Sequence, residues 1–161
     1  NQLHGEGYTF VVWIIGEGSE HGFLNQLAGQ LGIESFVKFC GSQTNIPLFL
    51  SAGNIFALTS LYEGGRTISI MEAQAAGKPC VISAAGDHNT LIENGVTGFI
   101  FEQGDQNAFV RSLKLLLDSP DLMDSFGEAA RRKAFSEYDI EIAANKHEQL
   151  YASVLAEMGE Y

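Results

Sequence analysis

The stretch from Leu58 to Pro79, LTSLYEGGRTISIMEAQAAGKP, contains the end of an apolar strand, a pair of glycines and the start of a helix. Gly77 and Pro79 are typical of a helix end, because glycine adopts left-handed backbone angles and proline cannot continue helical hydrogen bonding. A strand that leads directly into a helix is the unit from which parallel α/β sheets are built. This stretch therefore decides the fold class.

The turn between this strand and this helix is suited to binding an anion. Gly64 and Gly65 carry no side chain that would keep a ligand from the backbone. A helix that begins near Thr67 leaves its first N–H groups unpaired, and phosphate is the simplest anion for such a helix end. Glu63 and Glu72 bracket the turn, and their carboxylates can accept hydrogen bonds from hydroxyl groups. A sugar diphosphate offers both the phosphate and the hydroxyls.

Beyond this stretch, apolar runs alternate with amphipathic segments along the chain. The run 9–15 lacks polar alternation, which predicts a strand covered on both faces. Further short strands are predicted at 35–40, 54–58, 79–83 and 97–101. The helices expected between and after them carry candidate N-caps at Ser19, Asp105 and Ser119, and the last runs from about Asp139 toward Glu157. The pattern predicts an α/β fold: a Rossmann-like parallel sheet of about five or six strands with helices on both faces.

The central stretch resembles the nucleotide-sugar motif of retaining glycosyltransferases, the group 1 family that includes glycogen and sucrose synthases and many lipopolysaccharide and capsule transferases. That motif has Ser, two residues, Glu-Gly, a glycine-containing loop, apolar residues with Glu-Ala, and Ala-x-Gly-x-Pro-Val. The family usually has seven residues between the glutamates, whereas this chain has eight, so we expect a bulge at Gly64-Gly65. The matching segments are Ser60, Glu63-Gly64, Met71-Glu72-Ala73 and Ala76-Gly77-Lys78-Pro79.

The resemblance extends from Phe10 to Tyr151 and implies the carboxyl-terminal, donor-binding half of a two-domain (GT-B type) enzyme. We interpret residues 1–161 as a single nucleotide-sugar-binding domain, a fragment that lacks its N-terminal acceptor domain and is expected to be inactive alone. The full-length enzyme would transfer a sugar from a UDP or GDP sugar to a glycan or lipid-linked acceptor. Capsule, exopolysaccharide or lipopolysaccharide assembly would be its setting.

The resemblance also assigns roles to single residues. Glu63 would face the transferred sugar as the catalytic residue, and Glu72 would accept the ribose hydroxyls. The turn would hold the distal phosphate. Gly16 and Gly18 after the first strand would line the cleft, and the backbone of 39–41 at the end of the second strand would lie against the nucleobase. The donor-binding residues implied in this way are Gly16, Gly18, Phe39, Cys40, Gly41, Gly64, Gly65, Arg66, Thr67 and Glu72.

Each signal also has a plainer structural explanation. Gly16 and Gly18 could form an ordinary tight turn, 39–41 could be core residues before a turn, and Arg66 could be a solvated loop arginine. Glu63 could be a surface acid, and the helix dipole favours an acid such as Glu72 in any protein. The apolar neighbours of Glu72 nevertheless suggest a mostly buried helix, where a carboxylate needs a hydrogen-bond partner.

Two other classes of function stay open. Residues 16–22 offer an imperfect dinucleotide-binding turn, so an NAD(P)-binding oxidoreductase domain is one alternative. A non-enzymatic partner-binding α/β domain is the other. The segment 87–89 follows a strand at the expected ligand side of the sheet, but we interpret His88 as a surface loop histidine. His4, His21 and His147 lack metal-site spacing, so we expect no metal and no cofactor.

The composition limits the partners. With 9 basic and 20 acidic side chains among 161 residues, the net charge of −11 disfavours nucleic acid and anionic lipid. Cys40 and Cys80 lie in apolar runs as expected free thiols, with a disulfide as the alternative. No apolar run approaches about 18 residues, so we expect neither a signal peptide nor a membrane span, and we expect a cytoplasmic domain without membrane insertion. A peripheral position at the inner membrane face stays open for the full-length enzyme.

Overall fold

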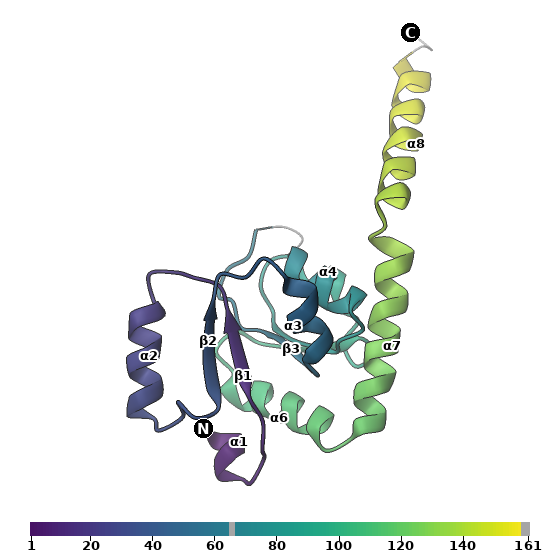
Figure 1. Cartoon of the computed structure of the whole chain (residues 1–161). Helices are drawn as coiled ribbons and strands as arrows, with labels where there is room; N and C mark the ends of the chain where they lie inside the picture. Colours follow the sequence, from purple (N-terminus) through teal and green to yellow (C-terminus); the bar gives the residue numbers. More distant parts are fainter. Residues whose placement is uncertain (65–66, 159–161) are drawn as a thin grey trace. The chain divides into compact units, whose positions relative to one another are not determined.

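The computed structural model describes residues 1–64 and 67–158 as an α/β protein with parallel strands (Figure 1). Every strand pairing between the strands of the described ranges is parallel, which confirms the α/β class expected from the sequence. These strands form a two-stranded and a three-stranded sheet, each smaller than the expected five or six strands. The strands are β1 (Val12–Ile15), β2 (Val37–Gly41), β3 (Phe56–Leu58), β4 (Cys80–Ser83) and β5 (Gly98–Phe101).

In the described residues a helix follows each strand, as expected of this fold, one helix precedes the first strand, and two more complete the C-terminal end. The helices are α1 (Gln2–Gly5), α2 (His21–Gln30), α3 (Ile46–Ala52), α4 (Ile68–Ala75), α5 (His88–Leu91), α6 (Gln106–Leu117), α7 (Pro120–Glu137) and α8 (Ile140–Met158).

Two of the three candidate N-caps are confirmed. Asp105 accepts a hydrogen bond from the Ala108 N–H and Ser119 accepts one from the Leu122 N–H, at the starts of α6 and α7. The third prediction is wrong: α2 begins after Glu20 instead of Ser19, and its cap residue makes no side-chain cap bond.

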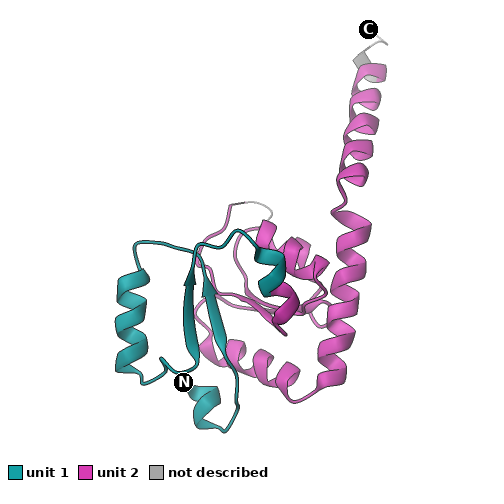
Figure 2. Cartoon of the chain, viewed as in Figure 1, with its two compact units in different colours: residues 1–49 teal, residues 50–161 magenta. Residues whose placement is uncertain are grey.

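The chain divides into two compact units, residues 1–49 and 50–161 (Figure 2). In the first unit β1 and β2 form a parallel pair, with Val12 opposite Val37. Phe36 is buried there and meets the Phe10 ring edge-on at a centroid distance of 5.6 Å. The prediction that β1 is covered on both faces is wrong, since Val12, Trp13 and Ile14 are all exposed, Trp13 by 41%.

In the second unit β4 is the central strand between β3 and β5. Every residue of β4 is buried. Because successive strand residues point to opposite faces, a strand without an exposed residue must be covered on both sides. The helices of this unit supply that cover.

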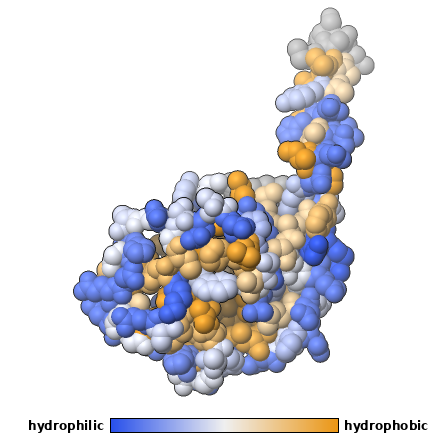
Figure 3. Space-filling view, in the orientation of Figure 1, coloured by the Kyte–Doolittle hydropathy of each residue, from blue (hydrophilic) through white to orange (hydrophobic). Residues whose placement is uncertain are grey.

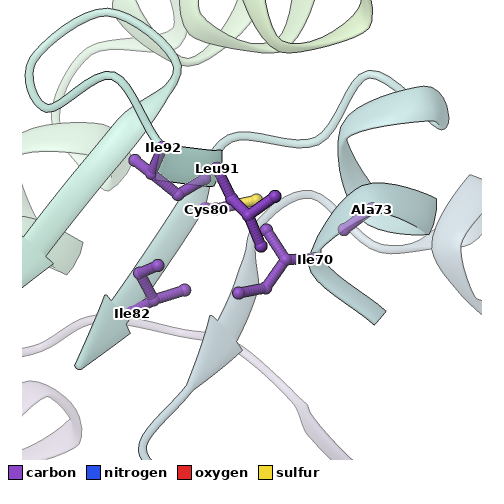
Figure 4. Close-up of a cluster of buried hydrophobic side chains, with 6 residues drawn as sticks. All are labelled: Ile70, Ala73, Cys80, Ile82, Leu91 and Ile92. Atoms are coloured by element: carbon purple, nitrogen blue, oxygen red, sulfur yellow. The ribbon is translucent and has the colours of Figure 1, made fainter. Parts of the chain in front are cut away.

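Two hydrophobic clusters lie on opposite faces of this sheet. In the first, Cys80 and Ile82 of β4 pack with Ile70 and Ala73 of α4 and with the Leu91-Ile92 pair (Figure 4). In the second, Val81 packs with β5, α6 and α7 residues, which are Phe101, Leu116 and Phe126. The alternation of Cys80, Val81 and Ile82 between the clusters confirms helices on both faces of this sheet.

Several apolar residues of α8 are exposed. They include Ile140, Leu150, Tyr151 and Val154, with Tyr151 exposed by 63%. Figure 3 shows strongly hydrophobic and strongly hydrophilic surface side by side along this segment. In the described part of the chain, none of the helices has the length and apolar character needed to cross a bilayer.

A close approach between α7 and the end of α4 generates a stability prediction. A Cβ atom at Gly127 would lie inside van der Waals contact of the Gly77 carbonyl oxygen, whereas one at Gly22 of α2 would meet nothing within 4 Å. Gly127→Ala should therefore destabilise the protein by about 1–3 kcal/mol in urea unfolding. Gly22→Ala, the matched control in another helix, should be neutral or stabilising by up to about 1 kcal/mol. Equal effects of the two substitutions would contradict this packing.

Candidate functional site

The residues just after β3 form a hydrogen-bonded group that fixes Glu63. The Ser60 hydroxyl donates to the Glu63 carboxylate at 2.6 Å, and the Ser83 hydroxyl donates to the Ser60 carbonyl oxygen at 2.6 Å. Ser83 is the last residue of the buried strand β4. Glu63 itself is half-buried, so part of the residue is accessible to solvent.

The backbone of Glu63 is also constrained by its neighbour Gly86. A Cβ atom at Gly86 would lie 2.6 Å from the Glu63 carbonyl oxygen, and Gly86 has a positive φ of +51°. Any other residue would be both strained and too large here. The loop after β4 therefore packs directly on the first residue of the turn.

Helix α4 begins beside this group. Thr67 is its N-cap residue in an extended conformation, yet its side chain makes no cap bond. The Thr67 hydroxyl instead lies 3.1 Å from His88 Nε2. Gly64 does not have a positive φ, and a Cβ atom built there would meet nothing within 4 Å. Gly65 and Arg66 lie outside the described residues. Their predicted phosphate contacts, and the predicted bulge at Gly64-Gly65, therefore stay predictions.

The interpretation of His88 as a surface loop residue is wrong. His88 begins the short helix α5 and is 0% exposed, with Nδ1 2.7 Å from the Ser83 carbonyl oxygen. The local sequence around it, Asp87-His88-Asn89, is polar and suggested solvent, but the apolar pair Leu91-Ile92 draws α5 into the core. In the sequence, this apolar pair was the feature that could have indicated the burial of His88.

The expected burial of Glu72 is also wrong, because its side chain is exposed. The buried residues of α4 are Ile70, Ala73 and Gln74, which share one face of the helix. At 100° per residue, Glu72 lies on the opposite side. Its charge therefore needs no buried partner, and its predicted contact with ribose stays a prediction.

In the first unit, the residues predicted to line the cleft lie at the carboxyl ends of β1 and β2. The Gly16 N–H donates to the Gly41 carbonyl oxygen at 2.8 Å. Gly16 and Gly41 have φ values of +128° and +64°, so each turn uses the backbone freedom of glycine. The Ser42 N–H donates to the Glu17 carboxylate at 3.4 Å and links the two turns. The structure thus brings Gly16 and Gly41 together.

The two cysteines are free thiols in different surroundings. Cys40 is half-buried at the end of β2, and Cys80 is fully buried at the start of β4. Burial raises the pKa of the Cys80 thiol well above its ordinary value, because the interior disfavours the charged thiolate. Among the described residues, no group of three or more His, Cys, Asp or Glu side chains could hold a metal ion.

The sequence of this chain matches the model of the "Glycosyl transferases group 1" family over residues 2–133. The chain belongs to this family. A relative from Bacillus anthracis, N-acetyl-alpha-D-glucosaminyl L-malate synthase, is 30% identical over 142 residues, which are 88% of this chain and 37% of the relative. The UDP-Gal:alpha-D-GlcNAc-diphosphoundecaprenol alpha-1,3-galactosyltransferase of Escherichia coli is 28% identical over 125 residues, 78% of this chain and 32% of that enzyme.

Several solved structures have the same fold as this chain. Anabaena HepE in complex with UDP superposes with a TM-score of 0.80 and 26% identity, over 89% of this chain and 41% of HepE. The Staphylococcus aureus protein TarM superposes with a TM-score of 0.85 over 92% of this chain and 30% of TarM, at 22% identity. This group 1 chain thus spans well under half the length of the relatives it matches.

The thiols offer a test of the strand positions in this group 1 domain. The thiolate is the reactive form of cysteine, and burial disfavours it. Iodoacetamide should therefore modify Cys40 at least about a hundredfold faster than Cys80 in the native protein, as measured by mass spectrometry of the peptides. In denaturant the two rates should become similar. Fast native modification of Cys80 would contradict its place in the core.

Proposed function

We propose that this chain is the donor-binding part of a retaining glycosyltransferase that takes its sugar from a nucleoside diphosphate. The observation that carries the proposal is the site after β3, where the Ser60 hydroxyl holds the Glu63 carboxylate beside the uncapped start of α4. Family membership and the similarity to HepE, whose structure contains UDP, support this ligand class.

The site residues divide into three roles in this proposal. The turn from Gly64 to Thr67 and the first N–H groups of α4 bind the distal phosphate, because a helix start carries partial positive charge. Glu72 accepts hydrogen bonds from the ribose hydroxyls, for which its exposed carboxylate is accessible. Glu63 faces the transferred sugar. No metal or organic cofactor is needed for these contacts.

The family resemblance also predicts donor contacts for residues of the first unit. Gly16 and Gly18 would leave room for the ligand beside β1, since nothing lies within 4 Å of a Cβ atom built at either position. The backbone of Phe39, Cys40 and Gly41 at the end of β2 would lie against the nucleobase. Because the carboxyl ends of parallel strands form the ligand side of open α/β sheets, these positions fit a nucleotide.

The proposed chemistry is sugar transfer with retention of the anomeric configuration. The acceptor hydroxyl attacks the anomeric carbon from the face that the diphosphate leaves, the bond to the leaving phosphate oxygen breaks, and that oxygen takes up the hydroxyl proton. The α4 start stabilises the negative charge on the phosphate, and Glu63 stabilises the positive sugar. The acceptor would be a glycan or lipid-linked glycan bound by an N-terminal domain of the same enzyme, in the cytoplasm or at the inner membrane face.

The ligand class can be tested by calorimetric titration of the 161-residue chain. We expect UDP or GDP to bind and NAD not to bind, because the phosphate turn lies after β3 and the 16–22 segment lacks the dinucleotide spacing. NAD binding without a response to either diphosphate would support an oxidoreductase domain. No binding of any of the three would support a non-enzymatic partner domain, and either result would contradict the proposal.

The two glutamates should differ in their effects. A hydrogen bond to a charged acceptor contributes about 1.5–3 kcal/mol, so Glu72→Ala should weaken diphosphate binding about tenfold or more. Glu63→Ala should leave diphosphate binding nearly unchanged, but in the full-length enzyme it should lower kcat more than it weakens donor binding. Glu141→Ala on α8 removes the same charge away from the site and serves as the control. Equal loss of diphosphate affinity in Glu63→Ala and Glu72→Ala would contradict this division of roles.

A further inference from the structure

The start of α4 differs from the starts of the other long helices of its unit. Asp105 and Ser119 accept hydrogen bonds from the N–H groups of Ala108 and Leu122, at 2.8 and 3.3 Å. Threonine in the N-cap position ordinarily does the same. Thr67 is in that position with an extended backbone, φ −78° and ψ 109°, but it makes no such bond. The Thr67 hydroxyl therefore has a different hydrogen-bond partner.

This partner is His88. Its Nδ1 lies 2.7 Å from the Ser83 carbonyl oxygen, and because a carbonyl can only accept, Nδ1 carries the proton. In the neutral ring Nε2 is then an acceptor. The Thr67 hydroxyl lies 3.1 Å from this nitrogen and can donate to it. This contact fixes the position of the hydroxyl oxygen, the atom that would otherwise accept a capping bond.

His88 is well suited to hold this hydroxyl in place. Its side chain is completely buried, so the ring cannot swing into solvent. Its anchor, Ser83, is also buried and ends the central strand of the sheet. The Ser83 hydroxyl in turn donates to the Ser60 carbonyl oxygen, and the Ser60 hydroxyl donates to Glu63. Both ends of the turn are thus connected to one residue of β4.

We propose that His88 is a positioning residue that holds the Thr67 hydroxyl away from the first N–H groups of α4 and keeps this helix start open to the donor diphosphate. The inference rests on the proposed function, because an uncapped start of α4 benefits the protein only if a phosphate binds to its free N–H groups. Without His88, the Thr67 hydroxyl turns to cap α4 and competes with the phosphate for the same N–H groups.

Substitutions at the two positions separate this role from a general effect on the fold. His88→Asn keeps a side-chain N–H donor for the Ser83 carbonyl oxygen, but its shorter side chain places no acceptor at the position of Nε2, which holds Thr67. Calorimetry should show UDP affinity reduced roughly fivefold, the effect of one ordinary hydrogen bond, with uridine affinity unchanged. Thr67→Val removes the competing hydroxyl, so in the Thr67→Val background His88→Asn should cause no further loss of UDP affinity. The double variant should recover the affinity of Thr67→Val.

A third variant tests the same idea without changing the core. Thr67→Asn introduces a strong N-cap side chain, and it should weaken UDP binding relative to Thr67→Val. In the unsubstituted chain, long-range ¹H–¹⁵N spectra should show the Nδ1–H tautomer of His88, and the Nε2 resonance should shift in Thr67→Val.

Three outcomes would overturn the positioning role while leaving the proposed function intact: UDP binding unchanged in His88→Asn, a double variant as weak as His88→Asn, or equal affinities of Thr67→Asn and Thr67→Val. An Nε2–H tautomer of His88 would overturn it as well. A lack of UDP binding by the unsubstituted chain would instead overturn the proposed function, and this inference with it.

Discussion

The complete burial of β4 is the constraint on which the second unit depends. A four-residue strand without an exposed side chain needs apolar cover on both faces, and Cys80, Val81 and Ile82 receive it alternately from α4 and α5 on one side and α6 and α7 on the other. Removing well-packed side chains of this kind typically costs about 2–5 kcal/mol each. The same burial obliges Ser83, the polar residue at the strand end, to satisfy its hydroxyl and carbonyl within the protein. Both hydrogen bonds lead to the candidate site.

The rigidity of the site follows from this arrangement. Glu63 is fixed through Ser60, and Thr67 through His88, so the two described ends of the turn are attached to the most buried strand of the unit. A ligand that bound between these ends would find its contacts already in position. Preorganised contacts cost little ordering entropy on binding, and they stabilise charge that develops during a reaction.

Much of the fold could be predicted because local patterns and packing agree. Short apolar runs became parallel strands, and Asp105 and Ser119 became caps, since side-chain oxygens there meet unpaired N–H groups. The exposure of β1 could not be predicted, because an apolar run indicates a strand but does not show whether other elements pack on both of its faces. Glu72 was misjudged since apolar neighbours in sequence occupy other faces of a helix. Only one narrow face of α4 is buried, and Glu72 does not lie on it. The buried residues are Ile70, Ala73 and Gln74.

The candidate site was only partly predictable for a similar reason. Glu63, Gly64 and Thr67 were predicted from the motif, and their roles in donor binding stay predictions. Hydrogen bonds connect Glu63 and Thr67 to Ser83 of β4 through Ser60 and His88. His88 is 21 residues from Thr67 in sequence, and their hydrogen bond arises only when α5 folds into the core. Contacts between distant segments are not encoded in any local pattern of residue types.

Binding of the diphosphate by the turn after β3 is the central claim, and backbone NMR tests it most directly. UDP would be titrated into the ¹⁵N-labelled chain, with uridine as the matched ligand that lacks phosphates. The account predicts that UDP, but not uridine, strongly shifts the amide resonances of Gly64 and of Thr67 to Ser69. Saturable UDP shifts that leave these amides unchanged and lie in α7 or α8 would contradict it.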